Sequence, residues 1–209
     1  MLKHINQIIC IIFLFFYTNV IVANAADMTI KDLIMGEKEN FHLRILATIP
    51  KNGQISIGPE NAKNTIIEFF DYKCGYCVKM HPELVSLVEE RDDTRVIFIQ
   101  YPILSQTSVK LAKLVLAANY QDKGFEIHDA LLTQRGSLTE ERIGKIIIES
   151  KIDQNILKKD LERIEIEEIL SITAFVAAGI GVKGTPAVFI NNTFNPGYVP
   201  KTNIEKLLK

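Results

Sequence analysis

The sequence predicts an α/β fold with a helical insertion, preceded by a leader and a short N-terminal extension. Two apolar, β-branched segments at 65–71 and 94–102 flank a helical stretch, which is the order of an α/β unit. The 3.6-residue period of helices then continues over about 103–180, before strand character returns at 186–192. Because these helices are interleaved with the strands, we treat them as an insertion rather than a separate domain.

Length and charge are those of an ordinary globular protein. The chain has 209 residues, of which 47% are hydrophobic, and a net charge of −1. A chain of this length buries a core without disulfide staples. Its balanced charge indicates no basic surface, so we expect no nucleic-acid partner.

Residues 1–25 have the features of a secretory signal peptide. A short basic start leads into the apolar run IIFLFFY, and Ala23 and Ala25 form an A-x-A cleavage pattern. The alternative is a retained membrane anchor, although polar residues shorten the apolar core. Cleavage would leave Cys74 and Cys77 as the remaining cysteines, in a periplasm or cell envelope where disulfides persist.

Residues 26–55 are the expected N-terminal extension, and 56–209 the expected domain. Thr29 and Asp32 could cap a short amphipathic helix in the extension. Such a short helix needs further contacts to persist. It either packs on its own domain or serves as an oligomerisation segment that makes a homo-oligomer.

Local signals define the elements of the domain. The run NTIIEFFDY predicts a buried strand at 65–71, and the following residues predict a helix at 75–91 that Pro82 should kink. Four helical stretches follow the strand at 94–102, with breaks at Gly136 to Ser137 and Ser150 to Asp153. After the last predicted strand come a turn, FNPGYVP, and a helix at 201–208.

Cys74, Gly75, Tyr76 and Cys77 form a C-x-x-C motif at the junction of the first strand and its helix. The free N–H groups and positive dipole end of a helix favour an anion, so this position stabilises a Cys74 thiolate. Cys77 lies one turn further on and should be more buried and protonated. These are the features of a reversible redox pair.

Two other uses of the motif fit less well. A structural zinc site needs four ligands, and the mature chain adds only His42, His81 and His128 to the pair. An inert disulfide would close a very short loop and restrict the unfolded chain only slightly. We therefore expect no metal and no cofactor. His81 and His128 are more typical of structural positions, although His81 could tune the thiolate.

The sequence resembles the thioredoxin superfamily, and within it the DsbA-type thiol-disulfide oxidoreductases of bacterial envelopes. The resemblance covers roughly 55–208. It rests on the strand IIEFFDY, the C-x-x-C motif, Pro82, and the segment GVKGTPAVFINN after a helical block. It implies a thioredoxin fold with a helical insertion and catalysis by Cys74 and Cys77.

The resemblance also implies supporting residues. Glu68 is an acid within an apolar strand, where burying a carboxylate is costly, and the acid at this position in the family moves protons to and from the buried thiol. The alternative is a Glu68 that faces solvent at a sheet edge. Thr185 and Pro186 resemble the family's cis-proline turn, which packs against the cysteines and pairs with an extended substrate; the alternative is an ordinary trans proline.

Gly75 and Tyr76 depart from the Pro-His pair of the DsbA prototype. Since no imidazolium lies between the cysteines, we expect a weaker oxidant than the prototype. The same Gly-Tyr pair, together with Thr185 before the proline, resembles the DsbC-type isomerases, which are dimers built on an N-terminal module.

The resulting functional prediction is a periplasmic enzyme that introduces or exchanges disulfides in exported proteins that contain cysteines, through Cys74 and Cys77. A membrane partner similar to DsbB would reoxidise it. The alternative is an oligomeric isomerase or reductase kept reduced by a membrane partner similar to DsbD. A third hypothesis is a non-enzymatic binding protein that inherited the fold.

Overall fold

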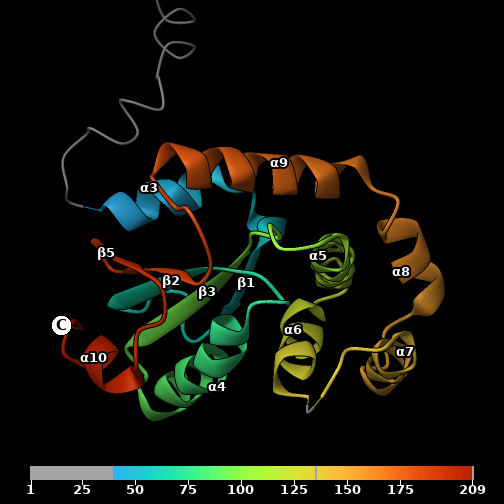
Figure 1. The fold of residues 1–209 in the computed structure, drawn as a ribbon, viewed down its shortest axis with the longest axis horizontal. Helices are drawn as coiled ribbons and strands as arrows, with labels where there is room; N and C mark the ends of the chain where they lie inside the picture. The colour runs from blue at the N-terminus through green and yellow to red at the C-terminus, as the bar shows by residue number, and fades with distance from the viewer. Residues whose placement is uncertain (1–39, 135, 209) are drawn as a thin grey trace, which may run out of the picture. The chain divides into compact units, whose positions relative to one another are not determined.

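The computed structural model describes residues 40–134 and 136–208 (Figure 1). The predicted signal peptide, residues 1–25, and the predicted helix that begins at Thr29 lie outside these ranges. Among the helices described, none has the length and apolar character needed to cross a membrane.

A five-stranded mixed sheet forms the centre of the domain, in the order β1-β3-β2-β4-β5 (Figure 1). β2 runs parallel to β3, and the other neighbouring strands pair antiparallel. The central strand β2 is buried along its whole length. The strands are β1 (Gln54–Ile57), β2 (Asn64–Phe70), β3 (Thr94–Gln100), β4 (Ala187–Ile190) and β5 (Thr193–Pro196).

Helices cover both faces of the sheet. Helices α3 and α9 lie on one face, and α4 and α10 lie on the other, next to the group α5 to α8 (Figure 1). A short 3-10 helix, η1 (Lys51–Gly53), leads into β1. The helices are α3 (Phe41–Thr48), α4 (Gly75–Glu90), α5 (Gln106–Asn119), α6 (Gly124–Thr133), α7 (Glu140–Glu149), α8 (Gln154–Asp160), α9 (Ile164–Gly179) and α10 (Lys201–Glu205).

The two-residue alternation of β2 divides its side chains between two hydrophobic clusters. Ile66 and Phe70 belong to the cluster on the α4 side, whereas Ile67 and Phe69 belong to the cluster under α3 and α9. Glu68 has the same parity as Ile66 and Phe70. The strand therefore directs this one acidic side chain toward the helix that carries the C-x-x-C motif.

The structure confirms the predicted α/β fold with its helical insertion, and it differs from the prediction at three places. The sheet has two edge strands that were not predicted, β1 and β5, and β5 occupies part of the predicted turn. Both are only four residues long, too short for a clear alternation. The last predicted helical stretch of the insertion is divided into α8 and α9, with a break after Asp160 where that carboxylate binds Arg163.

Candidate active site

Cys74 and Cys77 lie at the N-terminal end of α4, and both are free thiols. Cys74 is the N-cap residue: its N–H donates to the Asp71 carbonyl at 3.0 Å, and its own carbonyl accepts from Val78 at 3.1 Å. Cys74 is 7% exposed, whereas Cys77 is fully buried. The predicted difference in burial is therefore present, and Cys74 is the sulfur that a reactant can approach.

The peptide bond between Thr185 and Pro186 is cis, as predicted. The turn lies against the redox pair, because the Cys74 thiol donates a hydrogen bond to the Thr185 carbonyl at 3.2 Å. This bond joins residues 111 positions apart in the chain. A segment just before β4 is thus brought to the reactive sulfur.

Glu68 lies beneath the pair, with 1% of its surface exposed. It is on the central strand, so the alternative of a solvent-facing Glu68 at a sheet edge is wrong. Burial, followed by the charge of Cys74, raises the pKa of Glu68 from 4.5 to about 8, while a hydrogen bond with the Cys77 side chain acts in the opposite direction. Burial and the nearby Glu68 also raise the pKa of the Cys77 thiol. Glu68 can therefore hold a proton near neutral pH next to a thiol that resists ionisation.

Asp71 holds the loop between β2 and α4, a role that the sequence alone did not assign. Its buried carboxylate accepts the backbone N–H of Lys73 at 2.7 Å and of Leu104 at 2.9 Å, and the Ser108 hydroxyl at 2.6 Å. These bonds link the loop to the start of α5. An acid directly between an apolar strand and the C-x-x-C motif was the available signal, since Asp commonly accepts the N–H two residues further on.

His81 and His128 lie in a buried polar cluster behind the pair. His81 Nε2 is 2.8 Å from the Asp129 carboxylate, and His128 Nδ1 is 3.0 Å from the Tyr72 hydroxyl. Burial lowers the pKa of both imidazoles; the Asp129 carboxylate partly offsets this for His81, whereas the neighbouring His81 lowers the pKa of His128 further. Neither histidine hydrogen-bonds a cysteine in the described part of the chain.

Gly75 and Tyr76 form the exposed rim of the site. A Cβ added to Gly75 would have no neighbouring atom within 4 Å. Tyr76 is 64% exposed, and its ring centre is 6.2 Å from that of Tyr198. Of the described residues, no group of three or more His, Cys, Asp or Glu is placed to hold a metal ion.

Comparison with known proteins also points to thiol-disulfide chemistry. The sequence model of the thioredoxin family matches residues 51–209. A probable disulfide bond formation protein D of Bacillus cereus is 30% identical over 171 residues, which cover 75% of this chain and 79% of that protein.

Solved structures agree with this assignment. A thioredoxin-like oxidoreductase from Silicibacter pomeroyi is 28% identical, with a TM-score of 0.70 over 76% of this chain and 91% of that one. The thiol-disulfide exchange protein α-DsbA2 from Wolbachia pipientis is 25% identical, with a TM-score of 0.70 over 91% of this chain and 95% of that one. The chain therefore belongs to the thioredoxin family and is a DsbA-like thiol-disulfide oxidoreductase with the C-x-x-C pair Cys74 and Cys77.

Proposed function

We propose that the protein donates the Cys74–Cys77 disulfide to exported proteins in the periplasm or cell envelope, with Cys74 as the attacked sulfur. The observation that carries this proposal is the asymmetry of the pair. Cys74 is partly exposed beside the Thr185 carbonyl, whereas Cys77 is sealed beneath it. A substrate thiolate can therefore reach Cys74 and leave Cys77 as the departing sulfur.

The reaction has two exchange steps. A substrate thiolate attacks the Cys74 sulfur, so that a mixed disulfide forms and the Cys74–Cys77 bond breaks, releasing a Cys77 thiolate. A second substrate thiolate attacks the substrate sulfur of the mixed disulfide and releases Cys74. The substrate loses two electrons, which the enzyme holds as two reduced cysteines.

Glu68 supplies the proton that the departing Cys77 requires. Its carboxyl group hydrogen-bonds the Cys77 side chain and, with a pKa raised to about 8, holds its proton at neutral pH. A buried thiolate without a counter-charge is costly. Transfer of the Glu68 proton to Cys77 moves that charge to the Glu68 carboxyl group, because burial raises the pKa of the Cys77 thiol above that of Glu68. The reverse transfer prepares Cys77 for reoxidation.

Thr185 and Pro186 are proposed to align the substrate. The Thr185 carbonyl meets the Cys74 thiol at the site of attack. An extended substrate segment can pair with this backbone as strands pair in a sheet. Gly75 and Tyr76 would then form the surface over which the substrate lies.

The location and partners follow from the predicted leader and from the direction of the reaction. A signal peptide at residues 1–25 would place the enzyme where cysteines of exported proteins become oxidised. The Bacillus cereus relative is named as a probable disulfide bond formation protein, which favours donation of the disulfide. A membrane partner similar to DsbB would reoxidise the pair.

Trapping the mixed disulfide tests this proposal. Oxidised protein should oxidise an unfolded protein with two cysteines, and Cys74→Ser should abolish this activity. Reduced Cys77→Ser protein should accumulate an adduct through Cys74 when mixed with an oxidised substrate, as measured by mass spectrometry. Adducts that form on Cys77 in Cys74→Ser protein, or oxidation that survives Cys74→Ser, would overturn the assignment.

The second candidate is an oligomeric isomerase or reductase kept reduced by a membrane partner similar to DsbD. It is favoured by the exposed Tyr76 beside Cys74, together with Thr185 before the proline, the combination that resembles the DsbC type. Refolding of a scrambled disulfide substrate and the mass of the protein in solution separate the two candidates. A monomer with no isomerase activity dismisses the second.

A further inference from the structure

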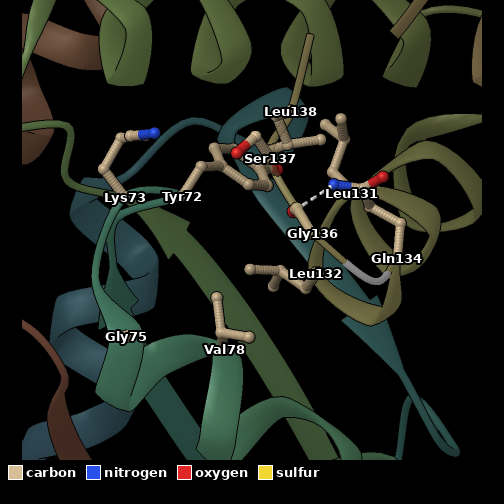
Figure 2. Close-up of a pocket in the computed structure, with 10 residues that line it drawn as sticks. All are labelled: Tyr72, Lys73, Gly75, Val78, Leu131, Leu132, Gln134, Gly136, Ser137 and Leu138. Atoms are coloured by element: carbon tan, nitrogen blue, oxygen red, sulfur yellow. Dashed lines mark hydrogen bonds between the residues drawn. The ribbon is translucent and has the colours of Figure 1, made fainter. Parts of the chain in front are cut away.

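A pocket of about 150 Å³ lies beside the redox pair, on the side of the helical insertion. Figure 2 shows its two walls. Lys73, Gly75 and Val78 come from the loop before α4 and from its first turn, whereas Leu132 on α6 and Leu138 before α7 face them. The pocket therefore lies between the redox motif and the insertion.

The pocket is lined by residues that are next to the reactive cysteine in the chain. Two of its lining residues, Lys73 and Gly75, are the chain neighbours of Cys74 on either side. Gly75 has no side chain and has open space at its Cβ position, so no side chain at this residue separates Cys74 from the pocket. Thr185 and Pro186 line a different hollow, so a polypeptide joined to Cys74 has two distinct surfaces to contact.

The walls suit one apolar side chain. Val78 is 39% exposed on the α4 side, and Leu131 and Leu132 form a buried base on α6. The volume is sufficient for a group the size of benzene. A leucine or phenylalanine side chain would thus remove the exposed part of Val78 from water.

The opposite wall of the pocket is held by polar bonds of its own. The Gln134 side-chain amide donates to the Gly136 carbonyl at 3.0 Å (Figure 2). The guanidinium of Arg142 donates to the Ser137 carbonyl at 3.4 Å. These bonds restrain Gly136 and Ser137 before a ligand arrives, which lowers the entropy cost of binding.

The charge at the pocket edge indicates which substrate residue should accompany that apolar side chain. Of the described residues that line the pocket, Lys73 is the only charged one, and it is exposed at the edge (Figure 2). A carboxylate on the ligand would meet this ammonium, whereas a lysine would be repelled. We propose that the pocket binds the substrate segment next to the reacting cysteine, with an apolar side chain between Val78 and Leu132 and an acidic residue near Lys73.

This inference rests on the proposed attack at Cys74, and the test uses the same sulfur. Reduced protein with Cys77→Ser is mixed with single-cysteine peptides whose sulfur carries a thionitropyridyl leaving group. The Cys74 thiolate attacks the peptide sulfur, the mixed disulfide forms, and the coloured thiolate leaves. The mixed disulfide of 2-mercaptoethanol with the same leaving group is the probe without a peptide. The rate of each peptide is divided by the rate of this probe with the same protein variant.

Eight peptides combine Leu or Ser with Asp or Lys on the two sides of the cysteine, each combination in both chain directions. In one direction, the Leu peptides should react about tenfold faster than the Ser peptides because an apolar side chain is buried. Val78→Ser should reduce this ratio to about threefold. Equal rates for Leu and Ser peptides in both directions would overturn the proposal.

The charge preference has a matched control at Lys79 on α4, close to Lys73 in the loop before that helix. Asp peptides should react about threefold faster than Lys peptides, as expected for an exposed ion pair, and Lys73→Glu should invert the order. Lys79→Glu makes the same charge change at a residue that lies over the Tyr198 ring and does not line the pocket, so it should keep the order. An equal effect of both variants would overturn the proposal, whereas failure of Cys74 to react even with the small probe would overturn the proposed function instead.

Discussion

The hydroxyl of Tyr72 lies 3.0 Å from Nδ1 of His128, and this hydrogen bond joins the loop before the redox pair to helix α6 of the insertion. Both residues are buried, and the Gln100 side chain donates to the same hydroxyl at 3.3 Å. A second bond, between His81 and Asp129, joins α4 to α6. The insertion is therefore attached to the active site by one buried and one partly buried polar bond as well as by apolar packing.

Tyr72→Phe should lower the free energy of unfolding by about 1–3 kcal/mol, because His128 and Gln100 lose a buried partner. Urea unfolding measures the change. Tyr101→Phe is the matched control, since its hydroxyl forms no hydrogen bond with another described residue; we expect a change within about 0.5 kcal/mol. An equal loss of unfolding free energy in the two variants would show that the Tyr72 hydrogen bonds make no net contribution to stability.

Asp71→Asn should slow the reaction of Cys74 and destabilise the protein by about 1–3 kcal/mol. The asparagine nitrogen cannot accept the hydrogen bonds that the carboxylate accepts from Lys73, Leu104 and Ser108. Ser108→Ala removes only one of these bonds and should cost about 1 kcal/mol. Both variants are assayed by urea unfolding and by the rate with the 2-mercaptoethanol disulfide. An Asp71→Asn protein that reacts at the wild-type rate would contradict a positioning role for this carboxylate.

Glu68 should make the reduced protein less stable as the pH rises from 4.5 to 8. Its pKa is about 8 in the folded protein and 4.5 in the reference state, so between these values the unfolded chain has lost a proton that the native state keeps. The unfolded chain binds fewer protons, and stability falls with rising pH. Glu68→Gln cannot ionise, so its stability relative to wild type should rise by roughly 4 kcal/mol between pH 5 and pH 8. If the difference in unfolding free energy between Glu68→Gln and wild type does not change with pH, the raised pKa of Glu68 is refuted.

His81 and His128 should have the opposite effect at acidic pH. Burial lowers the pKa of each imidazole below 6.5, so below this pH the unfolded chain takes up protons that the native state does not. Stability is thus lost as the pH falls through 6.5. The double variant His81→Gln, His128→Gln should lose less stability than wild type between pH 7 and pH 5. Parallel pH profiles for the two proteins would show that the histidines do not titrate differently on unfolding.

Local patterns were sufficient for the elements that hold the redox pair. The apolar run before the motif predicted β2, and the helical period after it predicted α4 with Pro82 inside. The same patterns were insufficient for β1 and β5, because a short edge strand has too few residues to alternate. They also left Asp71 without a role, since its partners Leu104 and Ser108 lie far along the chain.

By itself, the sequence determined the chemistry of this protein: two cysteines at helical spacing on the end of a strand, with an acid in that strand and a proline before a later one. These are local features, and a local signal is enough to detect them. Only the tertiary structure decided which way Glu68 faces, which carbonyl meets the Cys74 thiol, and what binds Tyr72 and the histidines. Each of these contacts joins segments that are distant in sequence. Burial and hydrogen bonding depend on which strands and helices become neighbours, and no single segment contains that information.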